Sequence, residues 1–383
     1  DNTLDFANVT GNAYTGRQRT TMKFRDTSAW YHIVVRIDLA NSTVSNRVRI
    51  YVNGILAESA FVRDSGAPAE WASNGAVQLT TAVASARIGA IGYATANPYD
   101  GYLADVNLVD GASLAPASFG EDKNGVWIPI APAVSEYGNC GFRLQFLLKG
   151  TAQDSAGMGA DTSGKARHFA KSSGNVASDS AMPDSPENNF ATWNVLSKGA
   201  GTSTAEGNLK AIYTSNNQAG ISSTFSVDTG KYYFEVGCQT ASVFIGVAPS
   251  TYKNPDNINS TTGSIHYAVN GNKSLAGTQT SYGASYGDGD VIGVALNLDD
   301  GEVTFYKNNS SQGALSLTSG LSYGISSASG SSTSTFTVIL NSGQDSSFAG
   351  TETAQGNTDG NGIGDFYYAP PSGFLALCTK NLP

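Results

Sequence analysis

The sequence is poor in charged residues and in cysteine, and each shortage excludes a class of protein. Only 14% of the 383 residues are charged and the net charge is −9. Lys and Arg never cluster in runs longer than two, so a phosphate backbone would be repelled and nucleic acid is not an expected partner. The three cysteines, Cys140, Cys238 and Cys378, are odd in number and far apart, which argues against a disulfide framework and against a zinc site built from cysteine pairs.

Long apolar runs are missing as well. No stretch approaches the ~18 residues that a membrane-spanning helix needs. The first residues also have neither the charged region nor the apolar region of a secretion signal. We therefore expect no membrane span.

Glycine, aromatic residues and small polar residues are abundant instead. The chain has 44 Gly, 18 Tyr and 16 Phe, with Ser, Thr and Asn between short apolar runs, a mixture typical of turn-rich antiparallel sheets. Its length exceeds what one hydrophobic core comfortably supports. The expected fold class is all-β, with two antiparallel β-sandwiches joined by a long irregular linker.

The first expected domain covers residues 1–134. Residues 31–38 alternate apolar and polar side chains with the period of a half-buried strand. Asn53-Gly54 predicts a type I′ hairpin turn after a strand at 47–51. Further strands are expected at 87–93 and 102–109.

Residues 135–199 lose this alternation and are expected to form a linker that partly wraps the second domain. The second domain, 200–345, has strong strand patterns at 231–238 and 243–248. A tight hairpin is expected to join 290–298 to 302–306 through Asp299-Asp300-Gly301. The last segment, 346–383, is expected to be a polar loop that ends in a closing strand near 374–378.

The order of these signals resembles known families. Residues 30–35, 49–54, 87–89 and 100–106 look like a concanavalin-A-like, laminin-G-like jelly roll, which here lacks its first strands. Residues 230–236, 244–247, 289–294 and 301–308 resemble the SPRY sandwich. The joining segments 108–129 and 184–192, together with the endings 370–377 and 381–383, look like tail-fibre or appendage proteins of bacteriophages.

No catalytic residues are expected. Glucanases of the jelly-roll fold need two carboxylates about 5 Å apart, whereas the strand around Asp105 offers only one acid. Two Gly-x-Ser-x-Gly matches, at 283–287 and 320–324, lack the helix that a serine-hydrolase elbow requires. The histidines, His32, His168 and His266, have no acid or cysteine at ligand spacing.

One motif suggests a metal, and calcium is the single cofactor considered. Oxygen-bearing side chains at relative positions 1, 3, 5 and 9, with Gly362 at position 6, match the beginning of a calcium loop; these residues are Asn357, Asp359, Asn361 and Asp365. Tyr368 stands where a bidentate Glu is expected. A polar glycine-rich turn is the alternative interpretation, and no cofactor is required.

Two loops carry candidate ligand-binding residues, because sugars are held by aromatic faces and planar polar side chains. One loop lies in each expected domain, and the candidate residues are Tyr93, Asn97, Tyr99, Asp100, Tyr282 and Tyr286. Exposed tyrosines are also ordinary in glycine-rich and serine-rich loops, so this alternative stays open.

The resemblance implies a non-enzymatic structural and adhesive protein of a virion, such as a tail-fibre, knob or spike component. It would be assembled in the host cytoplasm and be extracellular in the particle. Expected partners are other virion proteins, a host-surface glycan and further copies of the chain, with a trimer as the expected homo-oligomer. The alternatives are a purely architectural virion protein, such as a head decoration or fibre-joining subunit, and a polysaccharide depolymerase.

Overall fold

The computed structural model describes residues 2–10, 13–27, 29–62, 70–75, 77, 87–89, 99, 101–171, 181–214, 219–240, 242–251, 260–330 and 335–383. The chain is all-β and divides into two compact units, Asp1–Ser178 and Asp179–Pro383. Among the described residues there is no helix with the length and hydrophobicity needed to span a bilayer. The all-β expectation from the sequence is confirmed.

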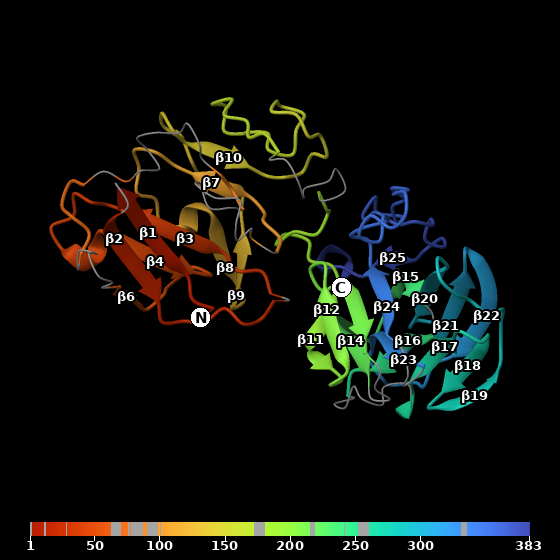
Figure 1. Ribbon diagram of the computed structural model, residues 1–383. Helices are drawn as coiled ribbons and strands as arrows, with labels where there is room; N and C mark the ends of the chain where they lie inside the picture. Colours follow the sequence, from red (N-terminus) through yellow and green to blue (C-terminus); the bar gives the residue numbers. More distant parts are fainter. Residues whose placement is uncertain are drawn as a thin grey trace. The chain divides into compact units, whose positions relative to one another are not determined.

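The first unit is built from small antiparallel sheets (Figure 1). They have the strand orders β1-β2-β6, β3-β4-β5, β7-β10 and β8-β9. The strands are β1 (Asp5–Thr10), β2 (Ala13–Thr20), β3 (Ile33–Ile37), β4 (Val48–Val52), β5 (Ile55–Leu56), β6 (Ser59–Phe61), β7 (Val106–Leu108), β8 (Gly120–Lys123), β9 (Val126–Pro129) and β10 (Phe142–Leu144).

The Asn53-Gly54 turn forms between β4 and β5, as predicted. Asn53 and Gly54 have φ angles of 49° and 76°, the left-handed values that a type I′ turn requires at both central positions. Trp127 of β9 packs directly against Gly54. Its indole Nε1 donates a hydrogen bond to His32 Nδ1 at 3.0 Å, so His32 has a structural partner.

The strand expected over 102–109 is shorter than its sequence pattern predicts. Only Val106–Leu108 forms a strand, because Asp105 has φ 47° and turns the extended backbone just before it. The strand expected at 87–93 falls mostly outside the described residues, and 87–89 forms no strand.

The two units divide between residues 178 and 179, inside the segment 135–199 that was expected to be a linker. β10 pairs with β7, so the chain after residue 134 continues the first unit. β11 (Trp193–Lys198) already pairs with β14 (Gly220–Val227) of the second unit. The division therefore falls between residues 178 and 179.

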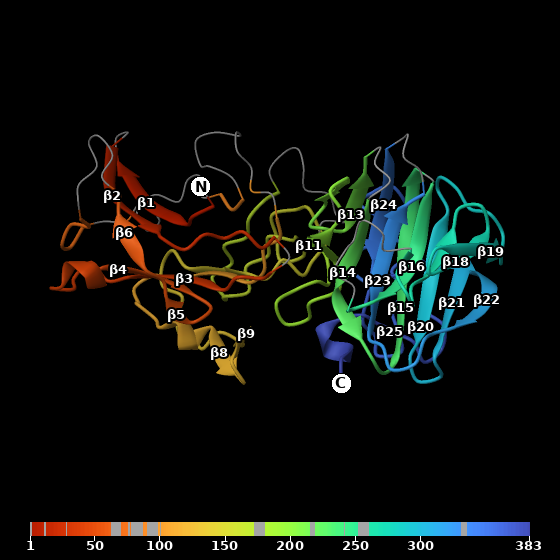
Figure 2. The same cartoon turned by 90° about the horizontal axis from the view of Figure 1, so that it is seen from below.

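The second unit is a sandwich of two large antiparallel sheets (Figure 2). The seven-stranded sheet has the order β11-β14-β23-β16-β17-β18-β19, and the eight-stranded sheet has β12-β13-β24-β15-β20-β21-β22 with β25 beside β15. The remaining bounds are β12 (Thr202–Ala205), β13 (Lys210–Tyr213), β15 (Lys231–Thr240), β16 (Val243–Pro249), β17 (Ile265–Ala268), β18 (Asn272–Leu275), β19 (Thr278–Ser281), β20 (Val291–Asn297), β21 (Glu302–Lys307), β22 (Ser310–Ser316), β23 (Tyr323–Ser329), β24 (Phe336–Asn341) and β25 (Leu375–Ala376).

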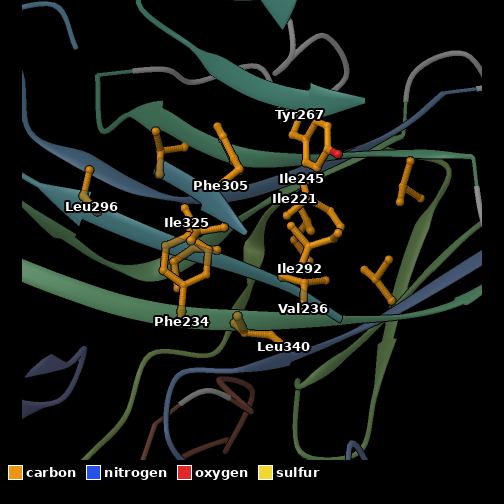
Figure 3. Close-up of a cluster of buried hydrophobic side chains, with 14 of the residues drawn as sticks. Ile221, Phe234, Val236, Ile245, Tyr267, Ile292, Leu296, Phe305, Ile325 and Leu340 are labelled. Carbon is orange, nitrogen blue, oxygen red and sulfur yellow. The ribbon is translucent and has the colours of Figure 1, made fainter. Parts of the chain in front are cut away.

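The main core lies between these two sheets. Phe234 and Val236 of β15 face Ile245 and Ile325 of the opposite sheet, and all four are fully buried (Figure 3). The expected alternation along 231–238 is therefore observed. The hairpin at 299–301 also forms, and Gly301 has φ 70°.

The C-terminal segment, residues 342–383, covers the outer face of the eight-stranded sheet. Phe366 stacks on Tyr233 with ring centroids 5.5 Å apart, and Phe348 lies over Gly237. β25 pairs in parallel with the start of β15 and lies within residues 374–378, where a closing strand was expected. The segment is also joined to residues almost 190 positions earlier, because Ala191 N donates to Leu377 O and Thr379 N donates to Asn189 O.

Candidate functional site

In the described part of the first unit, a polar pocket is a candidate binding site. Its volume is about 370 Å³, within the range of small-molecule sites. It is lined by Pro132, Val134, Ser135, Glu136, Tyr137, Arg143, Thr162, Ser163, Gly164 and Lys165. The pairing of β10 with β7 brings these segments together.

Arg143 supplies an oriented guanidinium group to this pocket. Its Nε donates to Asp105 Oδ1 at 2.7 Å and its Nη2 donates to Asp105 Oδ2 at 3.3 Å. Within the described part of the chain, Nη1 has no protein partner. A guanidinium fixed on one edge and free on another is suited to hold a planar or hydroxyl-rich ligand.

The pocket is also lined by a loop that the Asp161 carboxylate holds in place. The carboxylate accepts hydrogen bonds from Arg143 N at 2.9 Å, Ser163 N at 2.9 Å and Arg167 N at 2.8 Å. Partial burial acts to raise the pKa of this carboxyl, but the hydrogen bonds outweigh it and hold the pKa below its ordinary value. Asp161 is therefore an ionised structural anchor.

A partly exposed ion pair also lines the pocket. Lys165 Nζ lies 2.5 Å from Glu136 Oε1, and the two side chains are 34% and 65% exposed. The hydrogen bond from Lys165, with that from Gly138 N, lowers the pKa of Glu136. Exposed ion pairs contribute little to stability, so both groups can turn toward a ligand at small cost.

Tyr137 completes the wall as a neutral phenol. Its hydroxyl donates to Asn107 Oδ1 at 2.8 Å, and burial raises its pKa. The pocket thus offers ammonium and guanidinium donors beside one carboxylate acceptor. Asp105 and Asp161 are already engaged by Arg143 and by backbone amides.

The candidate ligand-binding tyrosines occupy different positions. Tyr286 is buried, and its hydroxyl donates to Val243 O and Tyr267 O, so its ring is not accessible to a sugar. Tyr282 is half-buried and donates to Gly313 O. Tyr99 is 56% exposed, and its hydroxyl donates to Tyr102 O. The other candidates of that loop, Tyr93, Asn97 and Asp100, lie outside the described residues.

The side chains of the predicted calcium loop have partners within the protein. The Asp359 carboxylate accepts from Asn361 N, Ile363 N, Ala376 N and Asn381 Nδ2. Three further side chains of the loop form hydrogen bonds with other residues of the C-terminal segment; these are Asn357, Asn361 and Asp365. The described ranges hold no group of three or more His, Cys, Asp or Glu able to hold a metal, and calcium binding stays a prediction.

Sequence reasoning missed the pocket residues Glu136, Arg143 and Lys165. They come from two irregular loops and one short strand, and no local pattern joins them. The one available signal was Asp161, because an Asp followed by Thr-Ser-Gly is typical of a turn in which the carboxylate caps nearby backbone amides.

Comparison with known proteins concerns the second unit. The model of the SPRY domain family matches residues 231–319, the stretch from β15 to just beyond β22. No curated protein sequence matches the chain significantly. The SPRY-like part of the sequence expectation is therefore confirmed, while the jelly roll and the phage-appendage resemblance stay predictions.

Solved structures, among them SPRY domains, are similar at low identity. The SPRY domain of human HERC1 is 18% identical over 37% of this chain and 93% of that chain, with a TM-score of 0.33. The TRIM65 PSpry domain is 17% identical over 39% of this chain and 91% of that chain, also with a TM-score of 0.33. Stonustoxin is 17% identical over 39% of this chain and 27% of that chain, again at 0.33.

Proposed function

We propose that this chain is a non-catalytic adhesion protein of a bacteriophage surface appendage. Its first unit would bind a sugar residue of a host-surface glycan, and its second unit would contact other virion proteins. The polar pocket around Arg143 is the observation that carries this proposal.

The chemistry of the pocket supports a hydroxyl-rich ligand. A sugar presents neighbouring hydroxyl groups that both donate and accept hydrogen bonds. The free Nη1 of Arg143 and the Lys165 ammonium are donors, and the Glu136 carboxylate is an acceptor. The hydrogen bonds to Asp161 hold the backbone of the loop that carries Lys165, so this backbone would need little further ordering on binding.

The match to the SPRY family supports the second half of the proposal. SPRY domains are generally binding modules. In this chain the sandwich is filled by a continuous apolar core, so contacts would be made by its loops and edges.

Glycan-array binding by the full chain tests the pocket, with Lys165→Ala and Glu136→Gln as variants. Each should weaken binding about tenfold or more, since a lost charged hydrogen bond is worth about 1.5–3 kcal/mol. Lys231→Ala is the matched control, because it removes an exposed Lys–Asp pair in the second unit and should leave glycan binding unchanged.

Two outcomes would contradict the proposal. Equal binding by the pocket variants and the wild type would place any glycan site elsewhere. Absence of glycan binding, with the protein found at a head or joint position in immunogold-labelled virions, would favour the architectural alternative.

A further inference from the structure

Two arginines lie directly opposite each other on neighbouring strands of the first unit. Arg36 of β3 is paired with Arg49 of β4 (Figure 1). Two positions along, Asp38 N donates to Arg47 O at 2.7 Å, and hydrogen-bonded pairs recur at every second position of an antiparallel ladder. Arg36 and Arg49 are therefore also such a pair, with Cα atoms about 5.5 Å apart, and their side chains leave the same face of the sheet.

This face is the one opposite the apolar core. Val48, Ile50 and Val52 of β4 are buried on the other face, because successive side chains of a strand alternate between faces. Arg36 and Arg49 are half-buried. Like charges directly opposite each other on paired strands are destabilising, and partial loss of hydration adds to the cost. The arginine pair therefore lacks a compensating charge unless an anion supplies it.

Neither guanidinium group has an acidic partner. In the ranges that the structure describes, no carboxylate oxygen lies within 4 Å of either group, whereas Arg17 and Arg143 each form an ion pair with an aspartate. Asp38 lies two positions after Arg36 on the same face. Its carboxylate accepts a hydrogen bond from Asn41 Nδ2 at 3.2 Å, and it belongs to none of these ion pairs.

The two guanidinium groups keep donors for a ligand. Arg36 Nε donates to Ser113 O at 3.1 Å and to Ser113 Oγ at 2.9 Å, which orients the group. Arg49 Nη1 donates to the Tyr51 hydroxyl at 3.5 Å, a long and weak bond. Among the described residues, Nη1 and Nη2 of Arg36 and Nε and Nη2 of Arg49 have no protein partner.

The negative charge of the chain does not oppose an anion at this place. Residues 1–178 contain 15 Lys and Arg and 15 Asp and Glu, whereas residues 179–383 contain 7 and 16. The net charge of −9 therefore belongs to the second unit, and all ten arginines belong to the first. Charges farther away than about 10 Å are largely screened at 0.1 M salt, so the local guanidinium pair dominates.

We propose that Arg36 and Arg49 together bind a phosphate monoester group. Such a group carries a charge of about −1.5 to −2 at pH 7 and three acceptor oxygens, which matches two guanidinium charges and the donors that they leave free. A carboxylate brings one charge and is satisfied by a single guanidinium fork. Neither arginine belongs to the lining of the pocket around Arg143, so this site goes beyond the proposed function.

Isothermal titration calorimetry of the full chain at low ionic strength tests the site. The probes are inorganic phosphate, glucose 6-phosphate and glucose. Equal binding of the first two would assign the phosphate group alone as the ligand. Tighter binding of glucose 6-phosphate, without binding of glucose, would assign a phosphorylated sugar. Absence of binding by both phosphate compounds would overturn the proposal.

The variant Arg49→Gln separates this pair from general attraction of anions. It should weaken phosphate binding about tenfold or more, since a hydrogen bond between charged groups is lost. Arg25→Gln removes the same charge from an exposed position of the first unit and should leave the affinity unchanged. Lys165→Ala in the glycan pocket should also leave it unchanged, so the two sites fail independently. Equal weakening by Arg25→Gln and Arg49→Gln would overturn the proposal.

Thermal unfolding distinguishes a ligand-binding arginine from a structural one. Without phosphate, Arg49→Gln should not lower the midpoint temperature of the first unit, because it removes a repulsion between like charges. Phosphate should raise the midpoint of the wild type more than that of Arg49→Gln. A lower midpoint in Arg49→Gln without phosphate, together with no effect of phosphate on the wild type, would show a structural role and overturn the proposal.

Discussion

Glu235 is a fully buried carboxyl group between the eight-stranded sheet and the C-terminal segment. Its Oε2 accepts from Tyr367 N at 2.8 Å, and its Oε1 accepts from Tyr368 N at 2.7 Å. Tyr233 and Asn341 of the sheet donate to the same carboxyl. Burial raises the pKa of Glu235 to about 7, and these hydrogen bonds limit the rise.

Stability should fall as the pH rises through this pKa. The ordinary pKa is 4.5, so between about pH 4.5 and 7 the folded state keeps a proton that the unfolded state has lost. The free energy of unfolding of the second unit should then decrease by on the order of 3 kcal/mol from pH 4.5 to pH 8. Urea unfolding at several pH values measures this decrease.

Glu235→Gln should flatten that dependence, because the amide does not titrate. Glu302→Gln, on an exposed position of β21, removes the same charge and should keep the wild-type slope. An unchanged slope in Glu235→Gln would show that other groups cause the pH dependence.

The roles of single residues were the hardest feature to predict from the sequence. Asp359 fits a calcium-loop pattern, yet its carboxylate accepts four hydrogen bonds within the C-terminal segment. Calcium and backbone amides both select closely spaced oxygen side chains. The pattern alone therefore does not distinguish a metal ligand from a turn anchor.

At the scale of the element, two glycine turns differ in what surrounds them. Gly54 and Gly301 both have positive φ, 76° and 70°. A Cβ on Gly54 would come within 2.3 Å of Trp127, whereas one on Gly301 would meet nothing within 4 Å. Backbone strain is shared by both positions, and only Gly54 adds a steric conflict.

Gly301→Ala should therefore destabilise its unit by about 1–2 kcal/mol, the cost of left-handed backbone for alanine. Gly54→Ala should cost more, since Trp127 must also move. Thermal unfolding and Trp fluorescence measure both effects. Equal losses at the two glycines would show that Trp127 adapts freely.

Local patterns predicted the hairpins and the long strands correctly, because alternation and turn chemistry act over a few residues. These patterns predicted a strand that begins before Asp105, whereas the left-handed backbone of Asp105 prevents pairing there. Local patterns also did not predict the pairing of β7 with β10 or the hydrogen bond from Thr379 N to Asn189 O. Such pairs depend on tertiary packing between distant segments.

At the scale of the whole molecule, each unit buries its own apolar side chains. Ile50 is fully buried in the first unit and Ile292 is fully buried in the second. The sequence predicted two β domains, but the boundary depended on the pairing of β10, a three-residue strand within an otherwise polar segment. Short strands of this kind are not visible in composition.

Calorimetry of the full chain should show two unfolding transitions. Ile50→Ala should lower the midpoint temperature of one transition, and Ile292→Ala should lower that of the other. Each buried Ile-to-Ala change should reduce the free energy of unfolding of its unit by about 2–5 kcal/mol. A single transition lowered by both variants would mean that the two units unfold cooperatively.

The covering role of the C-terminal segment has a consequence for biosynthesis. The outer face of the eight-stranded sheet stays open to solvent until Phe366 and β25 have left the ribosome. At typical elongation rates the second unit takes on the order of 10 s or more to synthesise. The first unit can fold during that interval. The second unit must complete its fold after nearly all of its residues have been translated. Chaperones that bind exposed apolar strands have their best access to the second unit at that stage.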